Sequence, residues 1–177
     1  MTDHKDIWIK TGYEIFAKTG ISGLKIETLA KKVGISKSSF YHHFTDMEIF
    51  VEFLLKHHIQ QANIIGEKEN NAKTIDPELI EILVEHKLDL LFNRQLRINR
   101  DIKLYQETLR QSHKAAGNGF VMVWIKDLNL QLTQMQLEGI FELALENFFL
   151  QINTQNLNAH WLSAYFANLK RIAAKFI

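Results

Sequence analysis

Five side chains that can hydrogen-bond or carry charge lie within six consecutive positions near the N-terminus: Lys37, Ser38, Ser39, Tyr41 and His42. Short hydroxyls allow a backbone to approach a ligand closely, a phenol contacts a phosphate oxygen, and an imidazole contacts a base edge or a phosphate. The lysine is long enough to reach a phosphate backbone from the flank. These residue types predict contact with nucleic acid rather than bond-breaking chemistry.

Two short helices would position this surface. The first has apolar residues at i, i+3, i+4 and i+7, namely Ile26, Leu29, Ala30 and Val33. Gly34 then supplies a turn, and Ser36 caps a second helix that ends at Phe44. On a helical wheel, the second helix turns Phe40 and Phe44 inward and leaves the polar set outside. This is the layout of a helix-turn-helix, in which the second helix enters the major groove of DNA.

The placement of charge agrees with this interpretation. The formal net charge of the whole chain is only +1, but residues 18–44 hold five lysines and one glutamate, which gives 5 − 1 = +4. A locally basic segment favours contact with phosphates.

Helical periodicity continues through the rest of the chain. With a single proline among 177 residues, the pattern predicts an all-α fold of about nine helices. The expected helices cover residues 3–20, 26–33, 36–44, 45–65, 76–91, 98–117, 120–130 and 133–152, and a ninth begins at Asn156 or Asn158 and runs to residue 177. Asp3 is the expected cap of the first helix, and Thr45 and Thr133 each begin a capping box. The polar stretch 66–74 and Gly117 are interpreted as breaks between helices.

The chain is predicted to divide into a helix-turn-helix domain, residues 1–47, and a helical-bundle domain, residues 48–177, that binds an effector and dimerises. The last two helices are apolar on more sides than one core requires, and such helices must be buried on most sides. A partner subunit is the expected cover, so we predict a homodimer. The aromatic residues expected in the interface are Phe141, Phe148, Trp161 and Phe166.

Other classes of function lack their sequence features. The chain has no cysteine, no phosphate-binding Gly-rich loop, no Gly-x-Ser-x-Gly motif and no Glu-x-x-His di-iron motif. The pairs His42-His43 and His57-His58 are adjacent in sequence and would point in different directions on a helix. We therefore predict no enzyme activity, no metal and no cofactor. No apolar run approaches the ~18 residues of a membrane span, which predicts a cytoplasmic protein without a membrane partner.

The helix-turn-helix residues also carry a resemblance to a known family. The motif consists of Phe16-x-x-x-Gly20, then Ile26-x-x-Leu29-Ala30-x-x-x-Gly34-Ile35-Ser36, then Phe40-Tyr41-His42-His43-Phe44. It resembles the signature of the TetR family of transcriptional regulators over about residues 8–55. The resemblance implies a repressor-like homodimer whose third helix reads double-stranded operator DNA and whose C-terminal domain binds a small-molecule effector. It also implies that Tyr41 binds a phosphate, with Lys37, Ser38, Ser39 and His42 along the groove.

Two positions depart from the family pattern. Met47 stands where members usually have a lysine that meets a DNA phosphate, and Leu24-Lys25 stands where a pair of hydroxyl residues is common. Lys25 is therefore expected to replace a hydroxyl–phosphate contact with a charged one.

A cavity for the effector is expected between the middle helices. The residues expected to line it are His86, Phe92, Tyr105, His113, Phe120 and Trp124, although aromatic residues at helical spacing also form ordinary cores. The alternative function is a helical carrier of small molecules or lipids that does not bind DNA. Binding of duplex DNA with a steep salt dependence would separate a regulator from a carrier.

Overall fold

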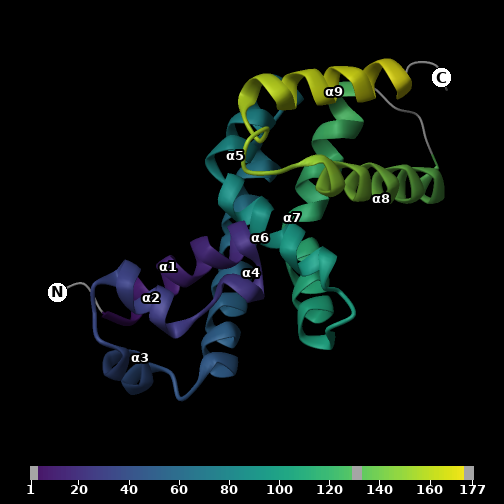
Figure 1. The fold of residues 1–177 in the computed structure, drawn as a ribbon. Coiled ribbons are helices and arrows are strands. Elements are labelled where there is room, and N and C mark those ends of the chain that lie inside the picture. The colour runs from purple at the N-terminus through teal and green to yellow at the C-terminus, as the bar shows by residue number, and fades with distance from the viewer. Residues whose placement is uncertain (1–3, 129–132, 174–177) are drawn as a thin grey trace.

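The structure, a computed structural model, describes residues 4–128 and 133–173 (Figure 1). This part of the chain contains nine α-helices and two short helical turns, and it has no strand. The predicted all-α fold is confirmed. Asp3, the expected cap of the first helix, and residues 174–177 at the end of the last lie outside the described residues.

Three helices form the N-terminal part, and each ends where the sequence predicted. α1 (His4–Thr19) ends at Gly20, α2 (Ile26–Val33) ends at Gly34, and α3 (Lys37–His43) ends at Phe44. The single turn η1 (Ile21–Gly23) lies between α1 and α2. Gly34 has a φ of 75°, a left-handed value that glycine adopts without steric cost, and its N–H bonds to the carbonyl of Ala30 to close α2.

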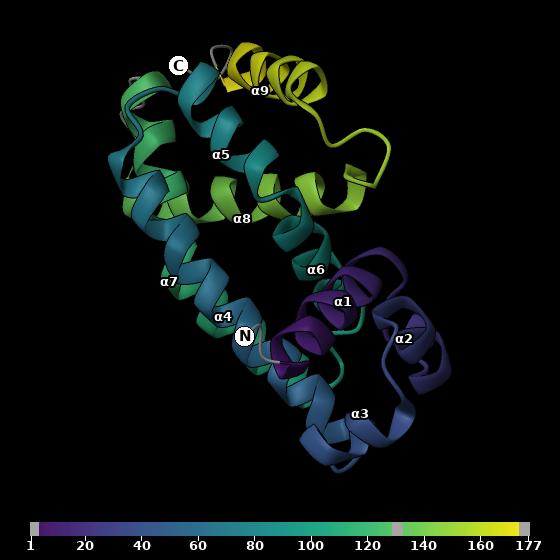
Figure 2. The ribbon, with the colours of Figure 1, turned by 90° about the vertical axis from the view of Figure 1, so that its left-hand side faces the viewer.

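Two long helices, α4 (Met47–Asn71) and α7 (Lys103–Leu128), run side by side (Figure 2). The helix breaks predicted near Gly66 and near Gly117 are wrong, because α4 continues through Gly66 and α7 through Gly117. A Cβ on Gly66 would lie 2.1 Å from the carbonyl oxygen of Ala115, and one on Gly119 would lie 2.7 Å from the Cβ of Glu69. The glycines therefore allow the two helices to approach closely, and each helix continues through the contact.

The expected helix over residues 76–91 is divided in the structure. The turn η2 (Ile75–Leu79) and α5 (Ile80–Glu85) come first, and α6 (Lys87–Ile98) follows a bend at His86, where ψ is 22°. Periodicity gave no sign of the bend because Leu83 before it and Leu91 after it are both buried. The His86 side chain bonds to Asp89 one turn later, with 2.9 Å between Nδ1 and Oδ2, and this contact stabilises the bend.

The next expected helix begins later than predicted. Residues 99–102 form the turn between α6 and α7. Ile98 and Ile102, which fall within the predicted helix, are 55% and 42% exposed because they flank this turn.

Of the two predicted capping boxes, the one at Thr133 is present and the one at Thr45 is not. α4 is capped by Asp46 instead of Thr45: the Asp46 carboxylate accepts a hydrogen bond of 2.9 Å from the N–H of Ile49. A carboxylate is also favoured at the positive end of a helix, which gives Asp46 the advantage. The capping box at Thr133 is confirmed, because its hydroxyl accepts from the N–H of Gln136 and the Gln136 side chain accepts from the N–H of Thr133.

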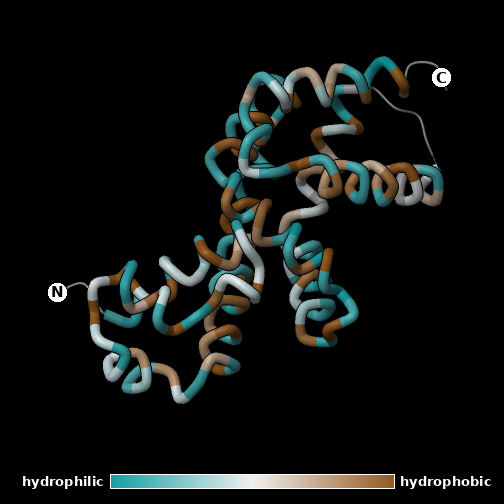
Figure 3. The backbone as a smooth tube through the Cα atoms, viewed as in Figure 1, coloured by the Kyte–Doolittle hydropathy of each residue, from teal (hydrophilic) through white to brown (hydrophobic). Residues whose placement is uncertain are grey.

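The last two helices, α8 (Gln134–Gln151) and α9 (Ala159–Ala173), lie at the opposite end of the molecule from α3 (Figure 1). α8 packs against α6, and α9 packs against α5. Apolar residues recur along both helices (Figure 3). Within the described ranges, no helix is both long and apolar enough to cross a membrane.

The close contact between α4 and α7 predicts that Gly66→Ala destabilises the fold. Alanine is a better helix former than glycine, but the new Cβ would meet backbone atoms that cannot move aside. We expect the free energy of unfolding to fall by about 1–3 kcal/mol, measured by chemical denaturation. Glu67→Ala, at the next and exposed position, should change it by less than about 0.5 kcal/mol. A Gly66→Ala protein as stable as wild type would show that the helices can separate without cost.

Candidate functional site

An aromatic cluster fixes the orientation of α3. Phe40 and Phe44 are fully buried, as the helical wheel predicted. The Phe40 ring meets Trp8 of α1 edge-on with 5.4 Å between ring centroids, and it meets Phe50 of α4 at 5.2 Å. Because α3 is packed against both α1 and α4, its opposite face is presented to solvent.

The predicted recognition residues lie on that solvent-facing side. Lys37, Ser38 and His42 are exposed, Ser39 is half-buried, and Tyr41 is 55% exposed. The structure thus brings these five residues to one surface.

Exposed lysines flank this surface. Lys37 forms an ion pair with Glu27, with 3.0 Å between Nζ and Oε1, and both side chains are exposed. Water and dissolved salt screen an exposed pair of this kind, so it holds the Lys37 side chain only weakly. Lys25 is exposed at the N-cap position of α2. Met47, which departs from the family pattern, is half-buried against the core.

A buried series of hydrogen bonds connects α1 to α4 and α6. The Tyr13 hydroxyl of α1 donates to Oδ1 of Asp89 in α6 at 2.7 Å, and it lies 2.8 Å from Nδ1 of His58 in α4. The other oxygen of Asp89 bonds to His86, whose Nε2 lies 3.0 Å from Nζ of Lys68. The Tyr13 ring also stacks on Phe92 with 4.2 Å between centroids.

These hydrogen bonds determine which ring nitrogen of His58 carries the proton. Burial and the neighbouring Asp89 raise the pKa of Tyr13 well above its usual value, so the phenol keeps its proton and donates it to Asp89. Nδ1 of His58 must therefore donate to the Tyr13 oxygen. Burial also lowers the pKa of His58 to about 4, so the ring is neutral near pH 7 and its Nε2 carries a lone pair. That Nε2 is buried and has no hydrogen-bond partner in the described structure.

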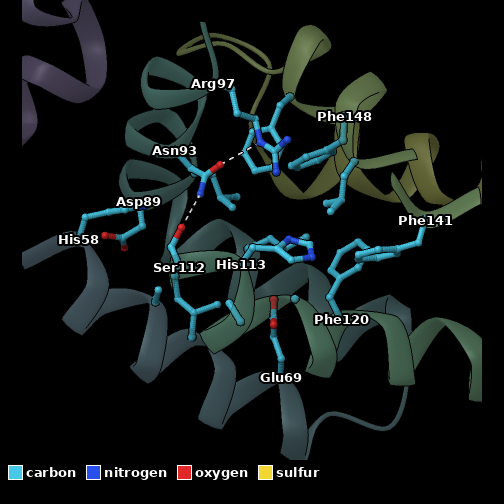
Figure 4. Close-up of a pocket in the computed structure, with 18 residues that line it drawn as sticks. His58, Glu69, Asp89, Asn93, Arg97, Ser112, His113, Phe120, Phe141 and Phe148 are labelled. Atoms are coloured by element: carbon cyan, nitrogen blue, oxygen red, sulfur yellow. Dashed lines mark hydrogen bonds between the residues drawn. The ribbon is translucent and has the colours of Figure 1, made fainter. Parts of the chain in front are cut away.

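A cavity of about 80 Å³ lies between α4, α6, α7 and α8. Figure 4 shows its polar and aromatic walls. His58 and Asp89 of the buried series line it, as does Glu69, which is 3% exposed. The aromatic part of the lining is formed by Phe120, Phe141, Phe148 and Phe149. Its lining combines apolar side chains with a few polar groups, as the linings of small-molecule sites do.

The predicted effector residues fall into two groups. His113 and Phe120 line the cavity. The other four lie elsewhere: His86 in the hydrogen-bonded series, Phe92 against Tyr13, Tyr105 edge-on to Phe16, and Trp124 against Phe120 and Phe166.

Sequence reasoning missed the polar residues that matter most to this cavity, namely Glu69, Asp89 and Arg97. A signal for Glu69 existed. It follows His58 by eleven positions, close to three helical turns, so the two residues share one face of α4 with Ala62 and Ile65. That face was obscured because α4 was expected to end before Glu69.

The residues predicted for a dimer interface are mostly packed inside the chain. Phe141 and Phe148 line the cavity, Phe166 contacts Phe120 and Trp124, and Trp161 stacks on Tyr165 and is half-buried. The outer face of α8 carries other apolar side chains. Met135, Ile140, Leu143 and Leu150 are 84%, 45%, 74% and 75% exposed.

The fold and the surface define a class of protein: an all-helical chain with an exposed helix-turn-helix at one end and a cavity in its helical bundle. Residues 9–52 match the family model described as bacterial regulatory proteins, tetR family. This match covers the helix-turn-helix region and agrees with the resemblance that its motif carries. The family is one of regulatory proteins and not of enzymes, in agreement with the sequence prediction.

Two curated relatives extend this match. The HTH-type transcriptional regulator YerO of Bacillus subtilis (strain 168) is 33% identical over 79 residues, which cover 45% of this chain and 25% of YerO. IcaR of Staphylococcus aureus (strain Newman), a negative transcriptional regulator of the biofilm operon icaADBC, is 25% identical over 130 residues. That match covers 73% of this chain and 66% of IcaR. The chain thus matches between a quarter and two thirds of the length of these relatives.

Solved structures share the fold over almost the whole chain. A transcriptional regulator from Rhodococcus sp. Rha1 superposes with a TM-score of 0.69 and 12% identity, covering 97% of this chain and 96% of that one. A TetR-family regulator structure from Rhodococcus sp. has a TM-score of 0.56 and 18% identity, covering 94% of this chain and 98% of that one. At these identities the likeness is one of fold.

The buried hydrogen bonds predict that Tyr13→Phe is destabilising although it removes a single oxygen. The change leaves Oδ1 of Asp89 and Nδ1 of His58 without the partner that they share. We expect the free energy of unfolding to fall by about 1–3 kcal/mol in chemical denaturation. Tyr41→Phe, at an exposed hydroxyl, should change it by less than about 0.5 kcal/mol. Equal stability of the Tyr13→Phe protein and the wild type would mean that these hydrogen bonds contribute nothing to the free energy of unfolding.

Proposed function

We propose that this protein is a sequence-specific, DNA-binding transcriptional regulator that acts as a homodimeric repressor under the control of a small molecule. Residues 1–47 form its DNA-binding domain, and residues 48–177 form the domain that binds the effector and dimerises. The observation that carries the proposal is the surface of α3: polar side chains at successive positions face solvent while Phe40 and Phe44 hold the helix from behind. The match to the tetR family over residues 9–52 supports it.

The residues of this surface divide into two roles. Tyr41, Lys37 and Lys25 contact phosphates, which sets the position of the protein on DNA without reading its sequence. His42 contacts a base edge in the major groove, and the small side chains of Ser38 and Ser39 let the helix approach closely. The locally positive charge of residues 18–44 favours the encounter with DNA.

A second copy of the chain is proposed to cover the outer face of α8. Ile140, Leu143 and Leu150 lie on one stripe of the helix with spacings of three and seven residues, and all three are exposed. Gly139 lies on the same side, and a Cβ there would meet nothing within 4 Å, so a partner helix can approach closely. Dimerisation would present two copies of α3 to successive major grooves, about 34–36 Å apart.

Control by an effector is proposed to act through α4. This helix begins directly after α3, and it carries His58 and Glu69 into the cavity. Its 25 residues span about 37 Å, so a small tilt at the cavity becomes a larger displacement near α3. A ligand changes DNA affinity only if it binds one arrangement of α4 better than the other.

The proposed roles predict different effects of two substitutions on DNA binding. Tyr41→Phe should weaken binding to all sequences alike because it removes a phosphate contact. His42→Ala should change which base pair is preferred at one position, at a cost of about 1–3 kcal/mol. The measurement is selection of bound fragments from a randomised duplex library, followed by titration at several salt concentrations.

Lys87→Ala serves as the control for this experiment, since Lys87 is an exposed cation on α6, outside the helix-turn-helix. It should leave both affinity and preference unchanged. Unaltered binding by the Tyr41 and His42 variants would contradict the residue roles, and a wild-type protein that retains no duplex DNA would contradict the proposed function.

The proposed dimer predicts that Leu143→Asp produces monomers. Leu143 is 74% exposed in the single chain, so the charge should not disturb folding, but it would be buried without a partner in the dimer. Sedimentation equilibrium should show a folded monomer whose operator affinity is strongly reduced. Ile64→Asp, which replaces an exposed apolar residue of α4, should remain dimeric. A monomeric wild-type protein at micromolar concentration would refute the dimer, and a dimeric Leu143→Asp protein would refute this interface.

A further inference from the structure

Glu69 is a buried carboxyl group without a full set of partners. It lies on the last turns of α4, is 3% exposed and points into the cavity (Figure 4). Its Oε2 is buried and has no hydrogen-bond partner in the described part of the chain. An unsatisfied buried polar group destabilises the fold, and a charged one does so more strongly. A group of this kind that faces a cavity indicates a ligand that satisfies it.

The other charged groups of the cavity lining are already paired. Arg97 of α6 contacts Glu146 of α8 and lies 4.5 Å from the centre of the Phe149 ring. Asp89 accepts hydrogen bonds from Tyr13 and His86. Burial and the nearby Arg97 lower the pKa of His113, which keeps this ring neutral near pH 7. Glu69 is therefore the titratable residue of the lining that is left for a ligand.

The polar atoms that remain free in the lining favour hydrogen-bond donors on the ligand. Nε2 of His58 is a lone-pair acceptor, as the hydrogen bond from Nδ1 to Tyr13 requires, and it is unpartnered. Oε2 of Glu69 is the second unpartnered atom, and it accepts hydrogen bonds when the carboxyl is ionised. The aromatic rings of Phe120, Phe141 and Phe148 stand around the same space, and ring faces attract cations.

We propose that the cavity binds a small organic amine, with its ammonium group on the Glu69 carboxylate and its apolar part among Phe120, Phe141 and Phe148. The proposal rests on the proposed function, because it names the chemical class of the effector. An ammonium group supplies the positive charge and the N–H donors that the free carboxyl lacks. His58 would sense the ligand at the other end of the cavity, where its ring joins the series of bonds to Tyr13.

Binding of such a ligand would release a proton. Burial raises the pKa of Glu69 to about 8, although the backbone N–H of Phe120 partly opposes this, so the carboxyl is mostly protonated in the empty cavity near pH 7. An adjacent ammonium group favours the ionised form. The other titratable groups around this space are His58 on α4, Asp89 and Arg97 on α6 and His113 on α7. The two histidines are already neutral, so Glu69 is the expected source of the proton.

Three probes of similar shape and different charge test the proposal: 2-phenylethylamine, 2-phenylethanol and 3-phenylpropionate. Isothermal titration of the full chain at pH 7 should show the amine binding at least tenfold more tightly than the alcohol, and the anion more weakly than either. Titrations in two buffers that differ in ionisation enthalpy should show up to one proton released with the amine and none with the alcohol.

Two matched variants test whether Glu69 causes the preference for the amine over the alcohol. Glu69→Gln keeps the shape of the side chain and removes its charge, so it should lose the tenfold preference and the proton release. Glu67→Gln makes the same chemical change at an exposed position of α4 and should behave as wild type. The preference and the proton release of the wild-type protein stand as a test even if the Glu69 variant fails to fold.

The outcomes separate this proposal from the proposed function. An amine that binds no more tightly than the alcohol, a tighter anion, or an unchanged Glu69→Gln protein would overturn the ligand class. The same wild-type preparation is also tested on the DNA fragments that it selects. If the protein binds DNA but not the amine, the proposed regulatory function is retained and the proposed effector class is rejected. If it binds the amine but no DNA, the proposed ligand of the cavity is retained and the proposed regulatory function is rejected.

Discussion

The Tyr13 hydroxyl donates to Asp89 and accepts from His58, and through these two bonds α1 is joined to α6 and α4. The bonds are buried and directional, and the stacking of Tyr13 on Phe92 adds an apolar contact at the same place. Because α1 also holds α3 through Trp8 and Phe40, the position of the helix-turn-helix depends on this junction. The N-terminal helices therefore cannot tilt freely with respect to α4 and α6.

The same junction borders the cavity. His58 and Asp89 both form hydrogen bonds with the Tyr13 hydroxyl, and both also line the cavity. A molecule in the cavity would lie one hydrogen bond away from α1. The proposed coupling between the cavity and α3 would use this short connection, because the His58 ring is bonded to the Tyr13 hydroxyl.

The close approach of α4 and α7 shapes the other end of the cavity. Gly119 leaves room for the Cβ of Glu69, and Gly66 lets the α7 backbone come near. The packing that these glycines allow also buries the Glu69 carboxyl, which raises its pKa. The α8 helix then closes the cavity with Phe141 and Phe148 on its inner side, while Leu143 and Leu150 remain on its outer side. This two-sided distribution explains why the helix is apolar on more than one face.

The sequence by itself determined the all-α fold, the C-terminal ends of α1 to α3 and the orientation of α3. These features depend on local spacing: glycine at left-handed positions, and Phe40 and Phe44 one helical turn apart. Only the tertiary structure decided that Gly66 and Gly119 lie in a helix contact rather than at helix ends, because glycine favours both and the difference lies in what stands opposite. It also decided which aromatic residues border the cavity, and that Glu69 lies there without a partner. Burial of a single polar group depends on helices distant in sequence, and periodicity along one helix does not contain that information.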